Sequence, residues 1–599
     1  RGIMTKAQGN TLLEVSWEVC NKVGGIYSVI TSKSTYMQDA YGNYFAIGPY
    51  KAQKAQDEFQ EGTPPKGWQP VLDTLHEEGI QVHCGTWDVK DKPDCLLIEY
   101  DGAWNKLDTL KKELWEHFGV DTLRSGDDLH EPLIFSYAVA RLVQELESKN
   151  LIDTKTVLHA HEWLAGFTVL LAKQWGCETK TAFTTHATML GRTISGVEGG
   201  LYEKLDDVDP DSKARELKVE DKFTTERATA HSADVFTTVS EITARECEKL
   251  LGKKPDVLVL NGLDVDHFPS FETTSITHRK NRAEIREFLR YAFYPHYTFD
   301  TKHNLTYLFA GRYEYENKGL DVLLESLKEL NEYLKRQDTK RTVSAFLCVA
   351  MPNKGPKYSL LKQKNMYQHL QDQLYNHSDA LLDQVLYDLL SDENKTEAEL
   401  MSASQFKDIH RTMSRFKQNG EPPLCSHELA EGEENNRIIQ RMRELGLTNQ
   451  EDDPVKVILY PAYLDGNDSL INLGYFDMIS GSHLGIFPSY YEPWGYTPVE
   501  TAGMSVPAVT TDLAGFGKYI QKELDTLTNE DGGIYVVERD GKSYDETVES
   551  LTRCLKDYAD LEHAERVKQK MKAKMLSEIP DWSTFKDYYL QAHNHALNQ

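Results

Sequence analysis

The feature that most constrains the fold is a series of short apolar runs that alternate with helical stretches along the 599 residues. Near-continuous apolar strands separated by helices are typical of parallel sheets that are covered on both faces. The runs form two series, separated near residues 270–300, which predicts two doubly wound α/β domains. The expected strands are residues 12–15, 44–47, 96–99, 157–161, 181–185, 235–239 and 257–260, then 305–310, 343–349, 455–460, 483–487, 506–510 and 534–537.

We place the first domain at residues 1–275 and the second at 276–579. Residues 355–452 interrupt the strand pattern. Within them, one helical face carries several apolar side chains, namely Leu382, Val385, Leu386, Leu389 and Leu390. This spacing predicts an inserted group of amphipathic helices. The insertion either packs on its parent domain or forms an oligomerisation arm.

Composition excludes several classes of partner. The 67 basic and 94 acidic side chains leave a net charge of −27. Such a surface does not attract nucleic acid or anionic membrane. The eight cysteines are scattered without a CxxC pair, which is typical of reduced thiols in a cytoplasmic protein. No apolar run approaches the ~20 residues that span a bilayer, so we expect no membrane partner.

Ligands of doubly wound sheets bind at the carboxyl ends of the strands. The first strand leads into Gly24 and Gly25, which precede a helix, with Lys22 beside them. Two glycines let the backbone approach a ligand, and a helix N-terminus offers N–H groups to an anion. The turn by itself fits a simple tight turn equally well.

The second domain carries a basic pair at an equivalent position. Arg312 and Lys318 follow the strand at residues 305–310. The planar guanidinium and the compact ammonium together suit two phosphates. The alternative is that both form surface ion pairs with Glu314 or Glu316.

The loop at residues 489–500 carries two carboxylates. Glu492 lies between aromatic residues in a stretch bounded by Pro and Gly, where it has no helical ion-pair partner, and it suits sugar hydroxyls. Thr497, Pro498 and Glu500 form a helix-capping signature. Capping and ligand contact therefore both remain open for Glu500.

Histidines end two strands of the first domain. His159 and His161 point to the same side of one strand, and His186 follows the next. The sequence offers no evident third ligand, so we expect no metal. A Ser-His-Asp hydrolase is excluded because no GxSxG motif occurs.

Several of these runs, in this order, resemble the glycogen synthases of glycosyltransferase family 3. They are residues 19–27, 161–166, 184–192, 236–240, 261–263, 310–319 and 487–500. The resemblance implies the GT-B fold, in which two Rossmann-like domains face a central cleft and the last helix, 580–599, returns to the first domain. It also implies retaining transfer of glucose from UDP-glucose to the 4-OH at the non-reducing end of an α-1,4-glucan such as glycogen, without metal or other cofactor.

The resemblance also assigns residues. Glu492 would bond the donor glucose, with His186 beside that sugar, and Arg312 and Lys318 would hold the diphosphate. Other donor-binding roles would fall to Lys22 with Gly24 and Gly25 at the diphosphate, Arg192 near the sugar, Tyr475 at the uracil, Glu500 at the ribose, and the N–H groups of Gly495, Tyr496 and Thr497 at the departing phosphate.

One stretch departs from the family pattern. Eukaryotic members carry a dense arginine cluster that senses glucose-6-phosphate, whereas residues 562–574 hold lysines and the single arginine Arg566 ahead of Asp581 and Trp582. Lysine does not reproduce the bidentate grip of arginine. The resemblance suggests a homotetramer but no longer implies this regulation, and a glycogenin-type primer protein stays an open question.

Three alternatives remain. The same fold serves enzymes that use ADP-glucose or another glucan acceptor. A catalytically silent glucan-binding scaffold would have damaged site residues, yet the charged set is intact: Lys22, Arg312, Lys318, Glu492 and Glu500. A phosphorylase would need a lysine that carries pyridoxal phosphate.

Overall fold

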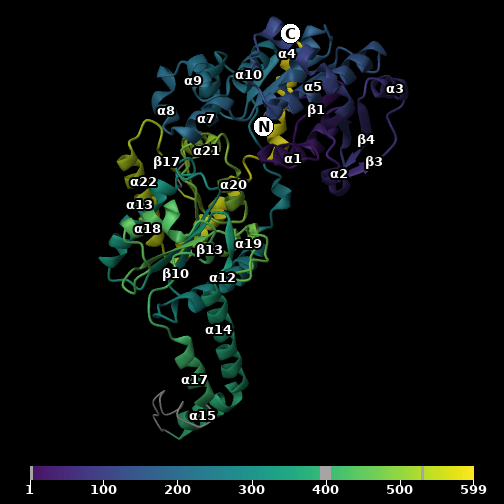
Figure 1. The fold of residues 1–599 in the computed structure, drawn as a ribbon. Coiled ribbons are helices and arrows are strands. Elements are labelled where there is room, and N and C mark those ends of the chain that lie inside the picture. The colour runs from purple at the N-terminus through teal and green to yellow at the C-terminus, as the bar shows by residue number, and fades with distance from the viewer. Residues whose placement is uncertain (1–4, 392–406, 528–531) are drawn as a thin grey trace.

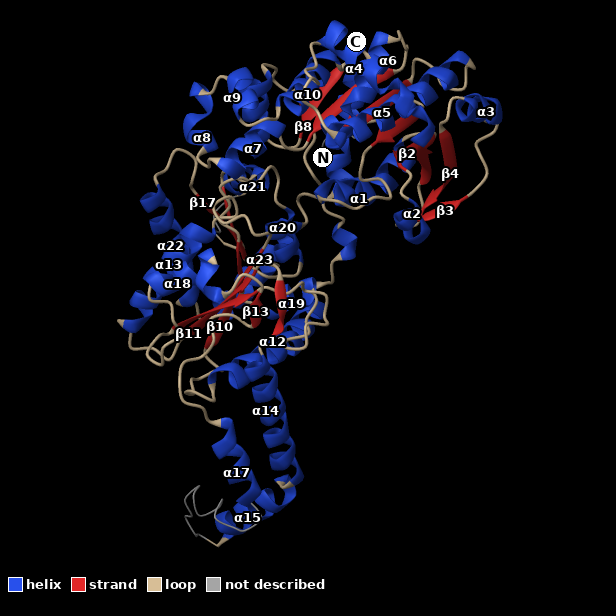
Figure 2. Cartoon of the chain, in the orientation of Figure 1, coloured by secondary structure: helices blue, strands red, loops and turns tan. Residues whose placement is uncertain are grey.

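The computed structural model describes residues 5–391, 407–527 and 532–599. The chain forms two α/β domains, one above the other in Figure 1, and a helical arm that projects from the second domain. Figure 2 shows a sheet inside each domain, with helices packed around it. The prediction of two doubly wound domains is confirmed.

The first sheet has nine strands in the order β3-β4-β5-β2-β1-β6-β7-β8-β9. The neighbours from β5 through β9 pair in parallel, and the strands expected there are present. The strands are β1 Thr11–Val15, β2 Asn43–Pro49, β3 Phe59–Glu61, β4 Gln81–Trp87, β5 Asp94–Glu99, β6 Thr156–His161, β7 Lys180–Thr185, β8 Val235–Thr238 and β9 Val257–Leu258.

One edge of this sheet differs from the sequence prediction. Strands β3 and β4 were not expected, and β4 pairs antiparallel with both β3 and β5. Only part of β4 is buried, and β3 is largely exposed. An edge of this kind lacks the continuous apolar run that marks a parallel strand covered on both faces. The prediction of a wholly parallel sheet is therefore wrong at this edge.

The second sheet is wholly parallel, in the order β14-β11-β10-β15-β16-β17. Its strands are β10 Asn304–Ala310, β11 Thr342–Cys348, β14 Val455–Tyr460, β15 Leu484–Ile486, β16 Ala508–Thr511 and β17 Ile534–Val537, with a separate antiparallel pair, β12 Asn353–Pro356 and β13 His427–Leu429. The main helices are α1 Gly25–Ala40, α4 Leu107–Phe118, α5 Asp127–Ser148, α6 Glu162–Gln174, α7 Met189–Val197, α10 Glu220–Ser232, α12 Phe271–Phe293, α13 Leu320–Lys335, α18 Arg437–Glu444, α19 Tyr475–Gly481, α20 Tyr496–Gly503, α21 Gly515–Thr526, α22 Tyr544–Ala559, α23 His563–Ser577 and α24 Trp582–Leu597.

The last helix, α24, returns from the second domain to pack against α1 and the first sheet. It also contacts the second domain, because Phe585 lies 5.3 Å from Tyr519, measured between ring centres. Trp582, Tyr589 and His593 of α24 are buried, and the ring of Tyr589 lies 4.2 Å from the ammonium of Lys33 in α1. The C-terminal residues are thus part of the core of the first domain. Helix α12 packs against α19 of the second domain, and the expected boundary at residue 275 lies inside it.

The expected insertion at residues 355–452 contains two different parts. Helices α14 Tyr358–Asn376, α15 Ser378–Leu390 and α17 Lys407–Phe416 form the projecting arm (Figure 1), whereas α18 packs against α13 of the second domain. The apolar side chains expected on one face of α15 are exposed, among them Leu386 and Leu390.

The described residues bear on the expectations about cysteines and about membrane-spanning segments. All eight cysteines are free thiols, and most are buried. None of the helices in the described ranges has the length and apolar character needed to cross a membrane.

Candidate active site in the interdomain cleft

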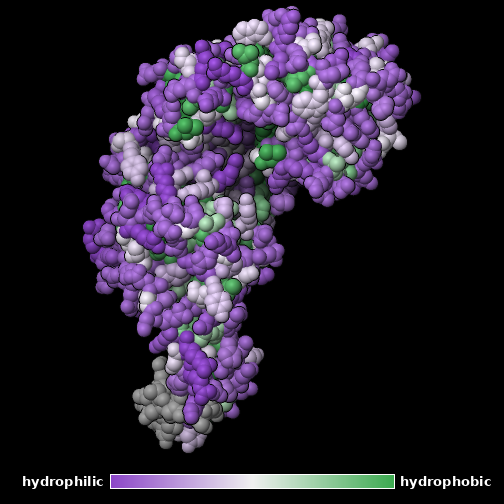
Figure 3. Space-filling model, viewed as in Figure 1, coloured by the Kyte–Doolittle hydropathy of each residue, from purple (hydrophilic) through white to green (hydrophobic). Residues whose placement is uncertain are grey.

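A cleft of about 790 Å³ lies between the two domains, and Figure 3 shows the hollow that separates them on the surface. Both domains line it. Among the residues expected at the site, its walls include Gly24, Gly25, His186 and Arg192 from the first domain and Arg312, Lys318, Glu492, Gly495 and Tyr496 from the second. The structure therefore brings together most of the residues that the sequence placed at strand ends.

Four expected residues are not part of the cleft wall, namely Lys22, Thr497, Tyr475 and Glu500. Lys22 is exposed, and its ammonium lies 5.5 Å from the ring of Tyr27. Thr497 borders a small adjoining cavity of about 30 Å³, which Lys318 and Glu492 also line. That space is large enough for a water molecule.

The capping role considered for Glu500 is wrong. Helix α20 begins at Tyr496, one residue before Thr497, and its N-cap is Gly495, which provides no side-chain cap. The φ of Gly495 is 96°, a conformation that favours glycine. Glu500 is instead half-buried and hydrogen-bonded to Tyr475, and desolvation raises the pKa of Glu500 to about 7.

On the second-domain wall, Lys318 forms an ion pair with Glu492, with 2.5 Å between Nζ and Oε2. Both side chains keep about a fifth of their surface exposed, 18% and 22%. The side chain of Arg312 is exposed and makes no ion pair or hydrogen bond with any residue that the structure describes. The alternative pairs with Glu314 or Glu316 are not formed, because Lys318 pairs with Glu492, and Glu316 pairs with Arg437 at 2.8 Å.

Close packing holds the loop that carries Glu492. A Cβ on Gly495 would lie 2.9 Å from Cγ of Glu492, and a Cβ on Gly319 would lie 2.0 Å from the carbonyl oxygen of Pro488. The backbone carbonyl of Asn317 accepts hydrogen bonds from the N–H groups of two loop residues, at 2.9 and 3.2 Å. The loop position is therefore set by backbone contacts that larger residues would disrupt.

On the first-domain wall, a carboxylate that the sequence analysis did not assign caps the Gly24-Gly25 turn. Oε2 of Glu18 accepts a hydrogen bond of 2.6 Å from the N–H of Tyr27 in the first turn of α1. Burial raises the pKa of Glu18, while Arg192 and Arg312, one from each domain, act in the opposite direction. The helix N-terminus expected to meet an anion is thus already capped by Glu18.

His186 lies at the junction of β7 and α7. The backbone N–H of His186 donates to Oε1 of Glu162 at 2.8 Å. The ring nitrogen Nε2 of His186 lies 2.9 Å from Nδ1 of His161. Burial lowers the pKa of His186 well below its usual range, so the ring is neutral at neutral pH. The φ of Glu162 is 66°, a left-handed conformation that is uncommon for a residue other than glycine. Strain of this kind often marks functional sites.

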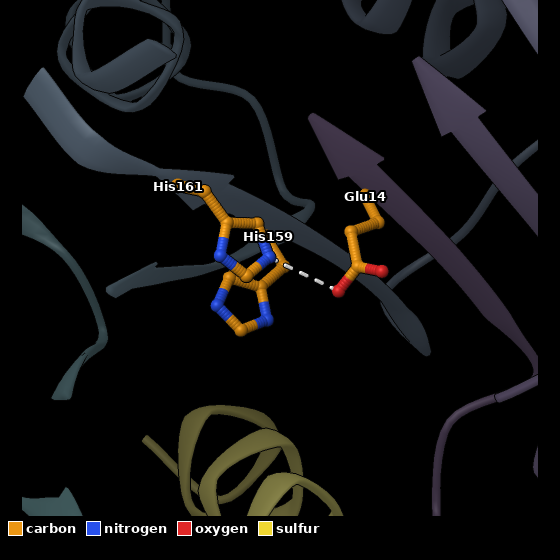
Figure 4. Close-up of side chains that lie close together, drawn as sticks. All are labelled: Glu14, His159 and His161. Carbon is orange, nitrogen blue, oxygen red and sulfur yellow. Dashed lines mark hydrogen bonds and ion pairs between the residues drawn. The ribbon is translucent and has the colours of Figure 1, made fainter. Parts of the chain in front are cut away.

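Glu14 of β1 joins His159 and His161 in a group of three possible metal ligands, shown in Figure 4. The sequence analysis missed this third ligand, a carboxylate, because it lies on another strand. The group does not fit a metal, since each donor already has a protein partner. Lys33 forms an ion pair with Glu14, which also bonds His161, and His159 bonds both His593 and Thr184.

Side chains from both domains also bond each other beside the cleft. The hydroxyl of Tyr491, next to Glu492 in the chain, donates to Glu246 of the first domain at 3.0 Å. Ser195 donates to the side-chain oxygen of Asn317 at 2.8 Å. Burial raises the pKa of Glu246 to about 7. The sequence carried no signal for these pairs, because their members lie far apart in the chain.

A second basic cluster lies away from the cleft, between α12 and α23. It contains His278, Arg282, Arg286, Arg341, His483, Arg566 and Lys570. Burial, together with Arg286 and Arg566, lowers the pKa of Arg282 to about 10, and burial and Arg282 lower that of Lys570 to about 8. None of the arginines or Lys570 forms an ion pair with a described carboxylate. The sequence analysis considered only the basic residues at 562–574, which lie on α23, and therefore missed the arginines that α12 contributes.

Comparison with known proteins agrees with this geometry. The family model described as glycogen synthase matches residues 14–599. The chain is 36% identical to the liver glycogen (starch) synthase of Mus musculus over 596 residues, which are 98% of this chain and 83% of that protein. It is 33% identical to glycogen (starch) synthase isoform 2 of Saccharomyces cerevisiae over 616 residues, or 99% and 87% of the two chains.

Among solved structures, the catalytic domain of starch synthase IV from Arabidopsis thaliana, bound to ADP and acarbose, superposes with a TM-score of 0.51. The alignment covers 99% of this chain and 100% of that one at 12% identity, so it speaks for the fold alone. The expected GT-B architecture is confirmed. On the extent and identity of these matches, the chain belongs to the glycogen synthase family of glycosyltransferases.

Proposed function

We propose that the protein transfers glucose from UDP-glucose to the 4-OH at the non-reducing end of an α-1,4-glucan, with retention of the anomeric configuration. The observation that carries the proposal is the convergence in one cleft of Arg312, Lys318 and Glu492 with His186 on the opposite wall. The relatives named glycogen (starch) synthase support glycogen as the acceptor.

The chemistry follows from charge. As the bond between the sugar and the diphosphate breaks, negative charge develops on the phosphate and positive charge on the sugar ring. Within the described ranges, the guanidinium of Arg312 has no partner and is available to the diphosphate, and the N-cap residue of α20, Gly495, provides no side-chain cap for the N–H groups there. Groups fixed in place before the reaction stabilise the separated charges without reorganising, and a single such donor contributes ~10²–10³ in rate.

The ion pair between Lys318 and Glu492 rearranges when the donor binds. The phosphate replaces Glu492 as the ion-pair partner of Lys318. The carboxylate of Glu492 is then available to accept hydrogen bonds from glucose hydroxyls. Domain closure then excludes water that would hydrolyse the donor. Glu500 of α20 and Tyr475 of α19, which are hydrogen-bonded to each other, are assigned to the nucleoside.

The reaction we propose needs no metal. Arg312, Lys318 and Arg192 supply the positive charge that a divalent cation supplies in other nucleotide-sugar enzymes. The eight free thiols fit a reducing compartment such as the cytoplasm.

A competition assay tests the donor. The protein is incubated with glycogen, radiolabelled UDP-glucose and a chelator, with and without unlabelled ADP-glucose. We expect label in the polymer, little competition from ADP-glucose and no effect of the chelator. Label that appears only as free glucose would indicate hydrolysis of the donor and contradict transfer. Binding of glycogen without any turnover of the donor would favour the scaffold. Strong competition would favour an ADP-glucose enzyme.

We further propose that the arm mediates homo-oligomerisation, with a tetramer as the expected state. The apolar face of α15 has no partner among the described residues, and exposed apolar surfaces of this kind mark interaction sites. Leu386→Glu combined with Leu390→Glu should yield a smaller particle by light scattering. Gln371→Glu on the exposed surface of α14 adds a charge without changing the apolar face and should leave the mass unchanged. Equal masses for the wild type and both variants would exclude the arm as the oligomerisation interface.

The second basic cluster favours an additional role as a phosphate-binding effector site. Its arginines and Lys570 are partly buried, and clustered cations that lose part of their hydration without carboxylate partners are costly unless an anion joins them. Glucose-6-phosphate is the first effector to test, because eukaryotic members of the family respond to it. Arg282→Ala should remove any activation while the activity without effector persists. Activation that survives this change would place the effector elsewhere.

A further inference from the structure

We propose that Glu14 and His161 are positioning residues that hold His186 as a neutral imidazole, with its unprotonated Nδ1 left to accept a hydrogen bond from a hydroxyl of the donor sugar. The inference rests on the proposed function, which places that sugar beside His186. It concerns the state and orientation of this ring, which the buried hydrogen bonds behind it determine.

The hydrogen bonds begin at Glu14, which is fully buried in β1. Its carboxylate forms an ion pair with Lys33 and accepts a hydrogen bond of 2.7 Å from the hydroxyl of Tyr44. An ionised carboxylate can only accept. Nε2 of His161 lies 3.1 Å from Oε2 of Glu14, so this nitrogen carries the proton.

The proton position on His161 determines the one on His186. Burial lowers the pKa of His161, so the ring is neutral and its Nδ1 has no proton. That nitrogen lies 2.9 Å from Nε2 of His186, which must therefore be the donor. Because His186 is also neutral, its Nδ1 is unprotonated. Nδ1 has no hydrogen-bond partner among the described residues, and His186 lines the cleft.

The neighbouring histidine belongs to a separate set of bonds. His159 stacks on His161 with ring centres 4.4 Å apart, but its nitrogens contact Thr184 at 2.6 Å and His593 of α24 at 2.8 Å. His593 in turn contacts the hydroxyl of Tyr41 at 2.7 Å. This second set ties the last helix to the first sheet and does not reach His186. His159 is therefore a matched control, equally buried and on the same strand.

The neutral state matters for the reaction. The sugar ring gains positive charge as the donor bond breaks, and an imidazolium beside it would oppose that charge. An unprotonated nitrogen instead accepts a hydrogen bond from a sugar hydroxyl and adds no charge. Glu14 meets the positive charge of Lys33 inside the core, so the ion pair fixes the proton positions without presenting a net charge to the cleft.

The kinetic test compares His161→Phe with His159→Phe, using UDP-glucose and glycogen, and measures UDP affinity by calorimetry. We expect His161→Phe to lower kcat by about tenfold or more, the loss of one well-placed hydrogen bond, with UDP affinity nearly unchanged. His159→Phe should change kcat less than about threefold and should mainly lower thermal stability. Equal losses in both variants, or a normal kcat in His161→Phe, would overturn the proposal.

A spectroscopic test does not depend on activity. Nitrogen chemical shifts of ¹⁵N-histidine-labelled protein, with the His186 signals identified by their loss in His186→Gln, distinguish protonated from unprotonated ring nitrogens. We expect unprotonated Nδ1 in the wild type and a mixture of both neutral forms in His161→Phe. If that variant does not fold, His161→Gln serves instead, since its amide keeps one donor and one acceptor and should preserve more of the wild-type state. A protonated Nδ1 in the wild type would refute the proposal, whereas a wild type that ignores UDP-glucose would refute only the proposed function.

Discussion

The two walls of the cleft are built differently. On the first-domain wall, His186 and the turn at Gly24 are held by buried carboxylates and histidines whose hydrogen bonds are formed before any ligand arrives. On the second-domain wall, Arg312 is exposed and has no side-chain partner among the residues that the structure describes, and Lys318 pairs with Glu492, which must release it.

This difference separates two contributions to the reaction. The first wall provides fixed geometry, because moving its groups would leave buried polar atoms without partners, at a cost of ~1–3 kcal/mol each. The second wall provides charge, which remains partly solvated until the domains close around the donor. Changes on the second wall should therefore reduce catalysis and leave the stability of the fold largely intact.

The largest effect is expected from Glu492→Gln. The change keeps the size of the side chain but removes the charge that faces the sugar, and we expect kcat to fall by ~10³. UDP should bind at least as well, because Lys318 is no longer neutralised by Glu492. Single-turnover transfer and calorimetry with UDP measure the two quantities. Glu549→Gln, at an exposed residue of α22, is the control, and weakened UDP binding would contradict the charge assignment.

Lys318→Ala and Arg312→Ala should follow, each lowering kcat by ~10². Thermal unfolding should change little for Arg312→Ala, because its side chain bonds nothing that the structure describes. Lys318→Ala also leaves Glu492 unpaired, so its effect on kcat should exceed that of Arg312→Ala. Arg553→Ala, a surface arginine of α22, controls for the loss of a positive charge. Near-normal rates would remove either residue from the phosphate role.

The sequence was sufficient to predict the parallel strands and most of the residues that line the cleft. The apolar runs of β1 and β10 are buried along their whole length, and chemistry at the ends of such strands is a property of the topology. The antiparallel edge at β4 was missed because a half-exposed strand carries a weaker pattern. The start of α20 was misplaced because Gly495 adopts a left-handed conformation that the capping signature at Thr497 does not reveal.

Contacts between distant segments were beyond the reach of the sequence. Glu14 and His161 lie 147 positions apart, and Glu246 and Tyr491 lie 245 apart. Their residue types carry no spacing that links them, so only the packed structure shows them as partners. The basic cluster was missed for the same reason, since its arginines come from α12 as well as α23.

The smallest effect on catalysis concerns Glu246, which joins the two walls through Tyr491. Burial raises its pKa from 4.5 to about 7, so the folded protein binds this proton more tightly than the unfolded chain does. The stability that the protonated form contributes is complete below pH ~4.5 and is lost as the pH rises through 7. The loss amounts to about 3 kcal/mol, from 1.36 kcal/mol per pH unit. Glu246→Gln cannot ionise, so its free energy of unfolding relative to wild type should improve by about this amount between pH 5 and pH 8 in chemical denaturation. A constant difference across that range would mean that Glu246 is ionised throughout, and the contact between the walls would then be a charged one at every pH tested.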